Sequence, residues 1–136
     1  MTVKLRTTQI GLKKPIEVHA NLKNVDKADE MMIALLSLNV EMDEADQVED
    51  PGESMKATVN ALKKEREFTK KSLVFLQDVL KLTDKQIDVV TEHVDYTILG
   101  EYLNYVCGRI KGMSEDAFKK ESKSAPKEQS ANSDEQ

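Results

Sequence analysis

The spacing of apolar residues changes along the chain, and the first pattern is that of strands. Apolar and polar residues alternate from 3 to 7 and again from 16 to 22, the period of a strand with one buried face. Gly11 and Pro15 bracket a basic connection between the two runs. The pattern predicts an N-terminal β-hairpin. Two strands alone are only marginally stable, so we expect this hairpin to pack on helices or on another subunit, and its open edge is a candidate assembly surface.

From Asn24 the period becomes that of a helix, which we expect to end near Leu38. Asn24 is the candidate N-cap. The expected inner face consists of Val25, Ala28, Met32, Leu35 and Leu36. The following residues, about 39–54, are rich in carboxylates and contain Pro51 and Gly52, so they predict an acidic connector between helices.

A second helix is expected to start at a Ser54 cap. Met55, Val59 and Leu62 give it an apolar stripe. The charged run KKEREFTKK follows at 63–71. This run leaves open whether a single helix continues to about residue 82 or breaks.

The highest apolar density lies between Leu73 and Met113, where we expect most of the core. Thr83 and Gln86 have the spacing of a capping box and predict the start of a short helix. Asp95 is the candidate cap of one more helix, from Tyr96 to about Lys111.

The end of this last helix is marked by Gly112, a candidate C-terminal cap glycine. Gly100 inside the helix suggests close packing against a neighbour. Ser114 is expected to start a final turn that contains Phe118. Residues 119–136 are charged and small, so they predict a disordered tail. The expected fold is mainly α (α+β): one domain at 1–118, with an N-terminal hairpin and a bundle of about four helices.

Two adjoining apolar stripes run along the last helix. One consists of Leu99, Leu103, Val106 and Ile110, and the other, roughly 90° away, consists of Ile98, Tyr102, Tyr105 and Arg109. The second stripe has two interpretations. It belongs to a wide face buried within the domain, or it binds a partner, since tyrosine and arginine are enriched at binding hot spots.

Charge and hydropathy narrow the class of protein. No window holds the roughly 18 apolar residues of a membrane span, and the N-terminus lacks the apolar region of a signal peptide. A cytoplasmic protein without membrane contact is therefore expected. The net charge of −5 is arranged in basic, acidic and basic bands, which can steer a charged partner or self-association but argue against a nucleic-acid partner.

No motif for catalysis or for a cofactor is present. The chain has a single cysteine, Cys107, and two histidines in different segments, His19 and His93. Read as a calcium loop starting at Asp43, the acidic connector has Val48 where the turn glycine is needed. We therefore expect a protein that is not an enzyme and binds neither cofactor nor metal.

Three blocks of this sequence carry a family resemblance: IGLKKPIEV at 10–18, FLQDVLKLTDKQID at 75–88 and LNYVCGRIKGMSE at 103–115. Across about residues 3–118 the chain resembles tail assembly chaperones of long-tailed phages and prophages of Gram-positive bacteria. Within that family it resembles the short, G-like product. Many members also have a longer, frameshifted form, which an amino-acid sequence cannot reveal.

The resemblance implies a helical, non-enzymatic protein of the bacterial host cytoplasm that is absent from the mature virion. Its implied partner is the tape measure protein, a long helical chain around which tail tube subunits polymerise. The major tail tube protein and further copies of the chaperone are additional candidate partners. The alternative from another class is a structural tail-completion or connector protein of the phage particle.

Overall fold

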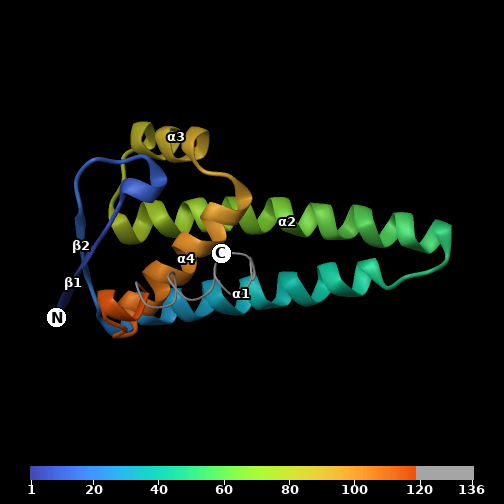
Figure 1. Ribbon diagram of the computed structural model, residues 1–136, viewed down its shortest axis with the longest axis horizontal. Coiled ribbons are helices and arrows are strands. Elements are labelled where there is room, and N and C mark those ends of the chain that lie inside the picture. Colours follow the sequence, from blue (N-terminus) through green and yellow to red (C-terminus); the bar gives the residue numbers. More distant parts are fainter. Residues whose placement is uncertain (119–136) are drawn as a thin grey trace, which may run out of the picture.

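The computed structural model describes residues 1–118 (Figure 1). The elements are β1 (Thr2–Leu5), a 3-10 turn η1 (Thr8–Ile10), β2 (Ile16–His19), α1 (Leu22–Asp46), α2 (Pro51–Leu80), α3 (Asp84–His93) and α4 (Tyr96–Ile110). The predicted fold class, mainly helical with an N-terminal antiparallel hairpin and four main helices, is confirmed. The predicted disordered tail at 119–136 lies outside the described residues. Within them, no helix is both long enough and apolar enough to cross a membrane.

The hairpin has the predicted alternation as far as His19, but Leu22, which was predicted to continue it on the buried side, begins α1 and is 88% exposed. β1 and β2 pair antiparallel, with Val3 opposite Val18, and both side chains are buried while the neighbouring strand residues are exposed. The connection turns at Gly11, whose φ of +88° lies in the left-handed region. A Cβ at this position would also lie 2.9 Å from Cγ of His93, so the turn packs closely against α3.

Helix α1 is longer than predicted at both ends. Its N-cap is Asn21, whose side chain accepts a hydrogen bond from the Asn24 amide, so the predicted cap is itself inside the helix. The helix continues to Asp46, and only residues 47–50 of the predicted acidic connector lie outside helices. The carboxylates do not end the helix because they point to solvent or to basic α2, as in the ion pair between Glu41 and Lys64.

Helix α2 starts at Pro51 instead of Ser54. The Asp50 side chain accepts a hydrogen bond of 3.0 Å from the Glu53 amide, and proline suits the first helical position because its missing N–H would have no partner there. The helix is continuous to Leu80. The charged run at 63–71 therefore does not break it, because Phe68 is buried on the side that faces α1.

The long helices α1 and α2 form an antiparallel hairpin, and the other elements gather at one end of it. Figure 1 shows α4 crossing in front of this hairpin, with α3 and the strands beside its base. The far ends of α1 and α2 project beyond every other described element. We call residues 36–66 the distal hairpin.

The caps of the shorter helices agree with the sequence. The Thr83 hydroxyl accepts from the Gln86 amide at 3.1 Å, and the Gln86 side chain accepts from the Thr83 amide at 2.9 Å. Asp95 caps α4 by accepting from the Ile98 amide at 2.7 Å. Gly112 has a φ of +108°, as expected for a cap glycine.

Two glycines inside α4 show where this helix packs closely and where it does not. The expected close contact at Gly100 is wrong, because an added Cβ there would meet nothing within 4 Å. The close approach is at Gly108, where a Cβ would lie 2.5 Å from Cζ of Phe118. Phe118 is buried, and the predicted turn before it is formed by Ser114, which accepts a hydrogen bond from Ala117.

Candidate interaction surfaces

The predicted partner-binding stripe of α4 lies inside the protein. Tyr102 is 0% exposed and Tyr105 is 3% exposed. The Arg109 side chain is 14% exposed, and Ile98 is half-buried. The stripe therefore offers little surface to a partner while the described residues keep this arrangement.

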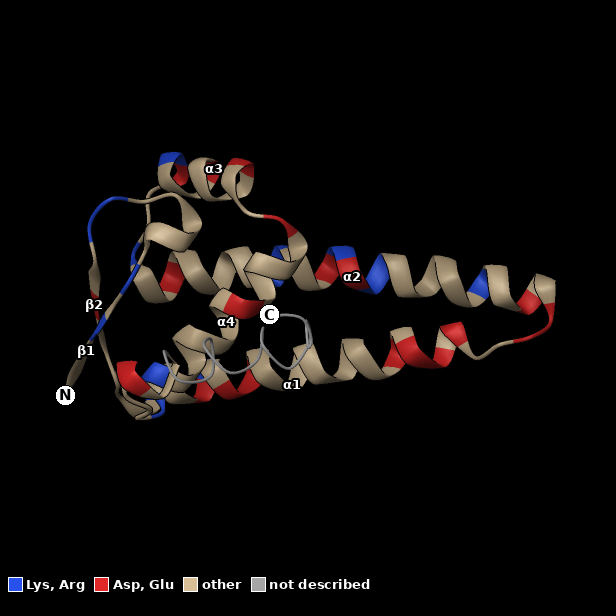
Figure 2. Ribbon diagram, viewed as in Figure 1, with Lys and Arg blue, Asp and Glu red and all other residues tan. Residues whose placement is uncertain are grey.

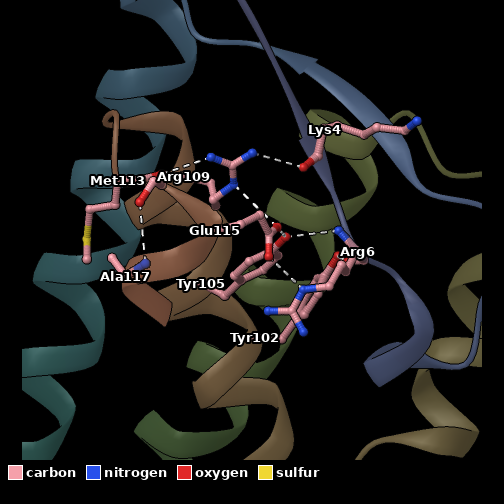
Figure 3. A network of polar contacts seen from close by, with 9 residues as sticks. Lys4, Arg6, Tyr102, Tyr105, Arg109, Met113, Glu115 and Ala117 are labelled. Atoms are coloured by element: carbon pink, nitrogen blue, oxygen red, sulfur yellow. Dashed lines mark hydrogen bonds and ion pairs between the residues drawn. The ribbon is translucent and has the colours of Figure 1, made fainter. Parts of the chain in front are cut away.

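The two tyrosines hold the N-terminal segment against α4 (Figure 3). The Tyr102 hydroxyl donates to the Arg6 carbonyl oxygen at 2.6 Å, and the Arg6 amide donates to the Tyr105 hydroxyl oxygen at 3.0 Å. The Tyr105 hydroxyl donates in turn to the carboxylate of Glu115. The Arg6 guanidinium lies 4.6 Å from the Tyr105 ring centre and pairs with Glu115 at 2.9 Å. Burial raises the pKa of Tyr102.

Arg109 completes this network on the other side. Its guanidinium donates to the carbonyl oxygens of Lys4 at 3.1 Å and Met113 at 2.9 Å, and Nε lies 3.5 Å from Glu115. The Phe118 ring packs edge-on against Tyr105, with 5.1 Å between centroids. The stripe thus ties both ends of the described chain to α4.

Of the two interpretations of the stripe, these contacts support a wide face buried within the domain. Binding of a partner by Ile98, Tyr102, Tyr105 and Arg109 stays a prediction, and it would require β1 and Phe118 to leave α4. The sequence could not reveal how the network joins β1 to α4, because Tyr102 and Arg109 donate to backbone carbonyls of Arg6 and Lys4, about a hundred positions away.

Large apolar side chains are exposed instead on the outer flanks of the long hairpin. On α1 these are Ile33 at 64%, Leu36 at 59% and Val40 at 58% exposed. On α2 they are Met55 at 71%, Val59 at 45% and Leu62 at 51% exposed; Val74, which is 66% exposed, lies apart from them and lines a hollow between the two helices. We call these two sets the α1 flank stripe and the α2 flank stripe.

Each flank stripe points away from the partner helix of the hairpin. At 100° per residue, Leu36 and Val40 lie about 160° to either side of the buried Leu38. Leu36 was predicted to face inward, and that prediction is wrong. On α2 the inner positions belong to Ala57 and Ala61, whose small side chains let α1 approach closely. The apolar stripe predicted for this helix exists, but it faces outward.

A third surface is a groove between α1 and α2 on the face opposite α4. Three hollows follow one another along it, the first two sharing Ala34 and Lys71 and the last two sharing Glu41 and Lys64. Only residues of α1, α2 and their loop line these hollows in the described part of the chain. We call this surface the hairpin groove.

The described residues show no arrangement suited to acid–base or metal chemistry. Among them, no three His, Cys, Asp or Glu side chains are placed to hold a metal ion. Cys107 is buried, and burial raises the pKa of its thiol to about 12, which keeps it protonated and unreactive near neutral pH.

Comparison with known proteins agrees with the resemblance seen in the sequence. The family model described as phage tail assembly chaperone proteins, TAC, matches residues 1–125. No curated protein and no solved structure gives a match. The matched range covers every helix and strand described above, including the hairpin with its flank stripes. The chain therefore belongs to the phage tail assembly chaperone family, whose members are not enzymes.

Proposed function

We propose that this chaperone binds a helical segment of the tape measure protein and promotes polymerisation of tail tube subunits around it in the cytoplasm of the bacterial host. The observation that carries this proposal is the pair of exposed flank stripes. Monomeric soluble proteins seldom present ordered rows of large apolar side chains without a partner.

The spacing of the stripes suits a helical client. Ile33, Leu36 and Val40 recur at intervals of three and four residues, and so do the apolar residues of the α2 flank stripe. This is the spacing of a seam along which a further helix packs lengthwise. The client would be recognised by its own apolar stripe, with little demand on its detailed sequence.

The expected affinity for the client is low enough for a chaperone that must release it. Full burial of one such side chain contributes about 2 kcal/mol, and roughly half of each is still exposed here. One stripe then contributes about 3 kcal/mol, or roughly a hundredfold in affinity. Several chaperone copies could cover a long client while each contact stays reversible.

Co-expression with the tape measure protein of the same genome tests the proposal. In the variant Ile33→Ser/Leu36→Ser/Val40→Ser we expect at least a tenfold loss of co-purified tape measure protein. The corresponding triple serine variant of the α2 flank stripe should also lose binding.

The control variant is Val89→Ser/Met113→Ser, which changes exposed apolar residues outside the hairpin and should bind normally. Circular dichroism should show unchanged helix content in all variants, because the replaced side chains are exposed. Full binding by both folded triple variants would contradict the proposal.

The alternative class, a structural tail-completion or connector protein, makes a different prediction for the phage particle. A chaperone should be missing from purified virions examined by mass spectrometry. Stoichiometric amounts of this chain in virions would favour the structural class.

A further inference from the structure

The hairpin groove is long enough and open enough to receive another pair of helices. Along α1 its lining runs from Lys27 to Ala45, which corresponds to about 27 Å of helix. Its floor is made of small or buried side chains, among them Ala34, Leu38, Ala45, Ala57, Ala61 and Phe68. Alanines along a helix pair leave room for close approach of further helices.

The two rims of the groove carry opposite charge. Glu30, Glu41 and Glu44 line the α1 side. On the α2 side Lys64, Lys70 and Lys71 outnumber the one acidic residue of the same stretch, Glu67. Figure 2 shows the wider trend, with acidic residues concentrated on the distal part of α1 and basic residues along α2. Near the base the order is reversed, because Lys27 of α1 pairs with Asp78 of α2.

We propose that a second copy of this chain docks groove to groove, forming a four-helix bundle with twofold symmetry. A twofold axis parallel to the hairpin places α1 of each copy over α2 of the other, at the same level along the bundle. The acidic rim then faces a basic rim, and Lys27 faces the partner's Asp78. An axis across the hairpin would place α1 over α1 and bring the acidic rims together, so the charges select the parallel axis.

The rest of the described chain leaves this face open. The strands, α3 and α4 are not among the residues that line the groove, and α4 crosses the opposite face of the hairpin. A strip of about 30 Å by 20 Å, two helices wide, buries roughly 600 Å² on each copy. The total of about 1,200 Å² reaches the lower end of specific, stable interfaces.

This pairing is independent of the proposed client site, because both flank stripes point sideways from the bundle. The geometry places the α1 flank stripe of one copy and the α2 flank stripe of the other on the same side of the dimer. A dimer would therefore have two apolar sides, each made of one α1 flank stripe and one α2 flank stripe from different copies.

Charge reversal on the full-length protein tests the pairing by analytical ultracentrifugation. The wild-type protein should sediment at about twice its mass of 15.3 kDa and shift toward monomer in high salt. The variants Lys70→Glu/Lys71→Glu and Glu30→Lys/Glu44→Lys should each be monomeric. Mixing the two variants should restore the dimer, since every acidic rim then meets a basic one.

A matched control variant changes the net charge of the protein as much as Lys70→Glu/Lys71→Glu does, but at positions away from the groove. The variant Lys13→Glu/Lys85→Glu alters exposed lysines and should remain a dimer. A monomeric wild-type protein at about 100 µM and low salt, or groove variants that stay dimeric, would overturn the proposal. So would groove variants that lose client binding while the wild-type chain is monomeric, because the groove would then belong to the client.

Cysteine cross-linking tests the direction of the axis. Ser37 of α1 and Glu67 of α2 both line the middle hollow, whereas the native Cys107 is buried. In an oxidised mixture of Ser37→Cys and Glu67→Cys proteins, the mixed disulfide dimer should exceed either symmetric dimer at least fivefold. Predominance of the symmetric Ser37→Cys dimer would refute the parallel axis.

Discussion

Replacing Tyr102 by phenylalanine tests whether the tyrosines of α4 are internal. The side chain is 0% exposed, and its hydroxyl donates to the Arg6 carbonyl at 2.6 Å. Tyr102→Phe keeps the ring in place but removes the donor and leaves that carbonyl without this partner. The lost hydrogen bond costs about 1 kcal/mol net, and the desolvated carbonyl raises the cost to about 1–2 kcal/mol.

Urea denaturation followed by circular dichroism measures this loss as a lower midpoint at unchanged slope. For a domain of this size, 1–2 kcal/mol also lowers Tm by roughly 4–8 °C. Tyr96→Phe is the matched control, since Tyr96 begins the same helix, is 41% exposed and has no hydroxyl partner among the described residues. Its stability should change by less than about 0.5 kcal/mol.

A Tyr102→Phe protein as stable as the wild type would refute the internal network. Truncation to alanine is a usual test of binding by a surface residue. Because Tyr102 is buried, Tyr102→Ala should instead lower the free energy of unfolding by about 3–5 kcal/mol, since it leaves a cavity. Loss of partner binding in that variant would therefore be uninformative unless folding is measured alongside it.

Further predictions concern the glycines and the thiol of α4. Gly100→Ala should stabilise the protein by about 0.5–1 kcal/mol in thermal unfolding, since the added Cβ meets nothing within 4 Å. Gly108→Ala should destabilise it, because the added Cβ displaces Phe118. Equal effects of the two variants would contradict the packing described here. Because burial raises the pKa of Cys107 to about 12, its contribution to stability is complete below the ordinary thiol pKa near 9 and is lost as pH rises toward 12. Urea midpoints should therefore fall above about pH 9, and less steeply in Cys107→Ala; an identical pH dependence would refute this role.

Local signals located the two shorter helices correctly, whereas the caps predicted for the long helices, Asn24 and Ser54, were wrong by a few residues. The capping box at Thr83 and the Asp95 cap depend on groups three residues apart, so both can be recognised from a short stretch of sequence. The strands at the N-terminus were found for the same reason, because alternation is a local pattern that burial of one face imposes.

Signals that depend on distant residues were missed. The acidic run at the end of α1 indicated a connector, because nothing nearby shows that basic α2 packs beside it. The same applies to the inner side of α2, where Ala57 and Ala61 are too small to mark an interface, while Met55 and Val59 have the apolar pattern of a buried face. In this part of α2 the contact with α1 is made by small residues, which hydrophobic periodicity does not weigh.

The projecting distal hairpin allows its length to change without disturbing the base. The far ends of its helices extend beyond the other described elements. The connection at its tip is four residues long, from Gln47 to Asp50. Insertion of seven residues into each helix would preserve the inner and outer sides, since seven residues make nearly two complete turns. Related chains could therefore carry a longer or shorter arm on the same base.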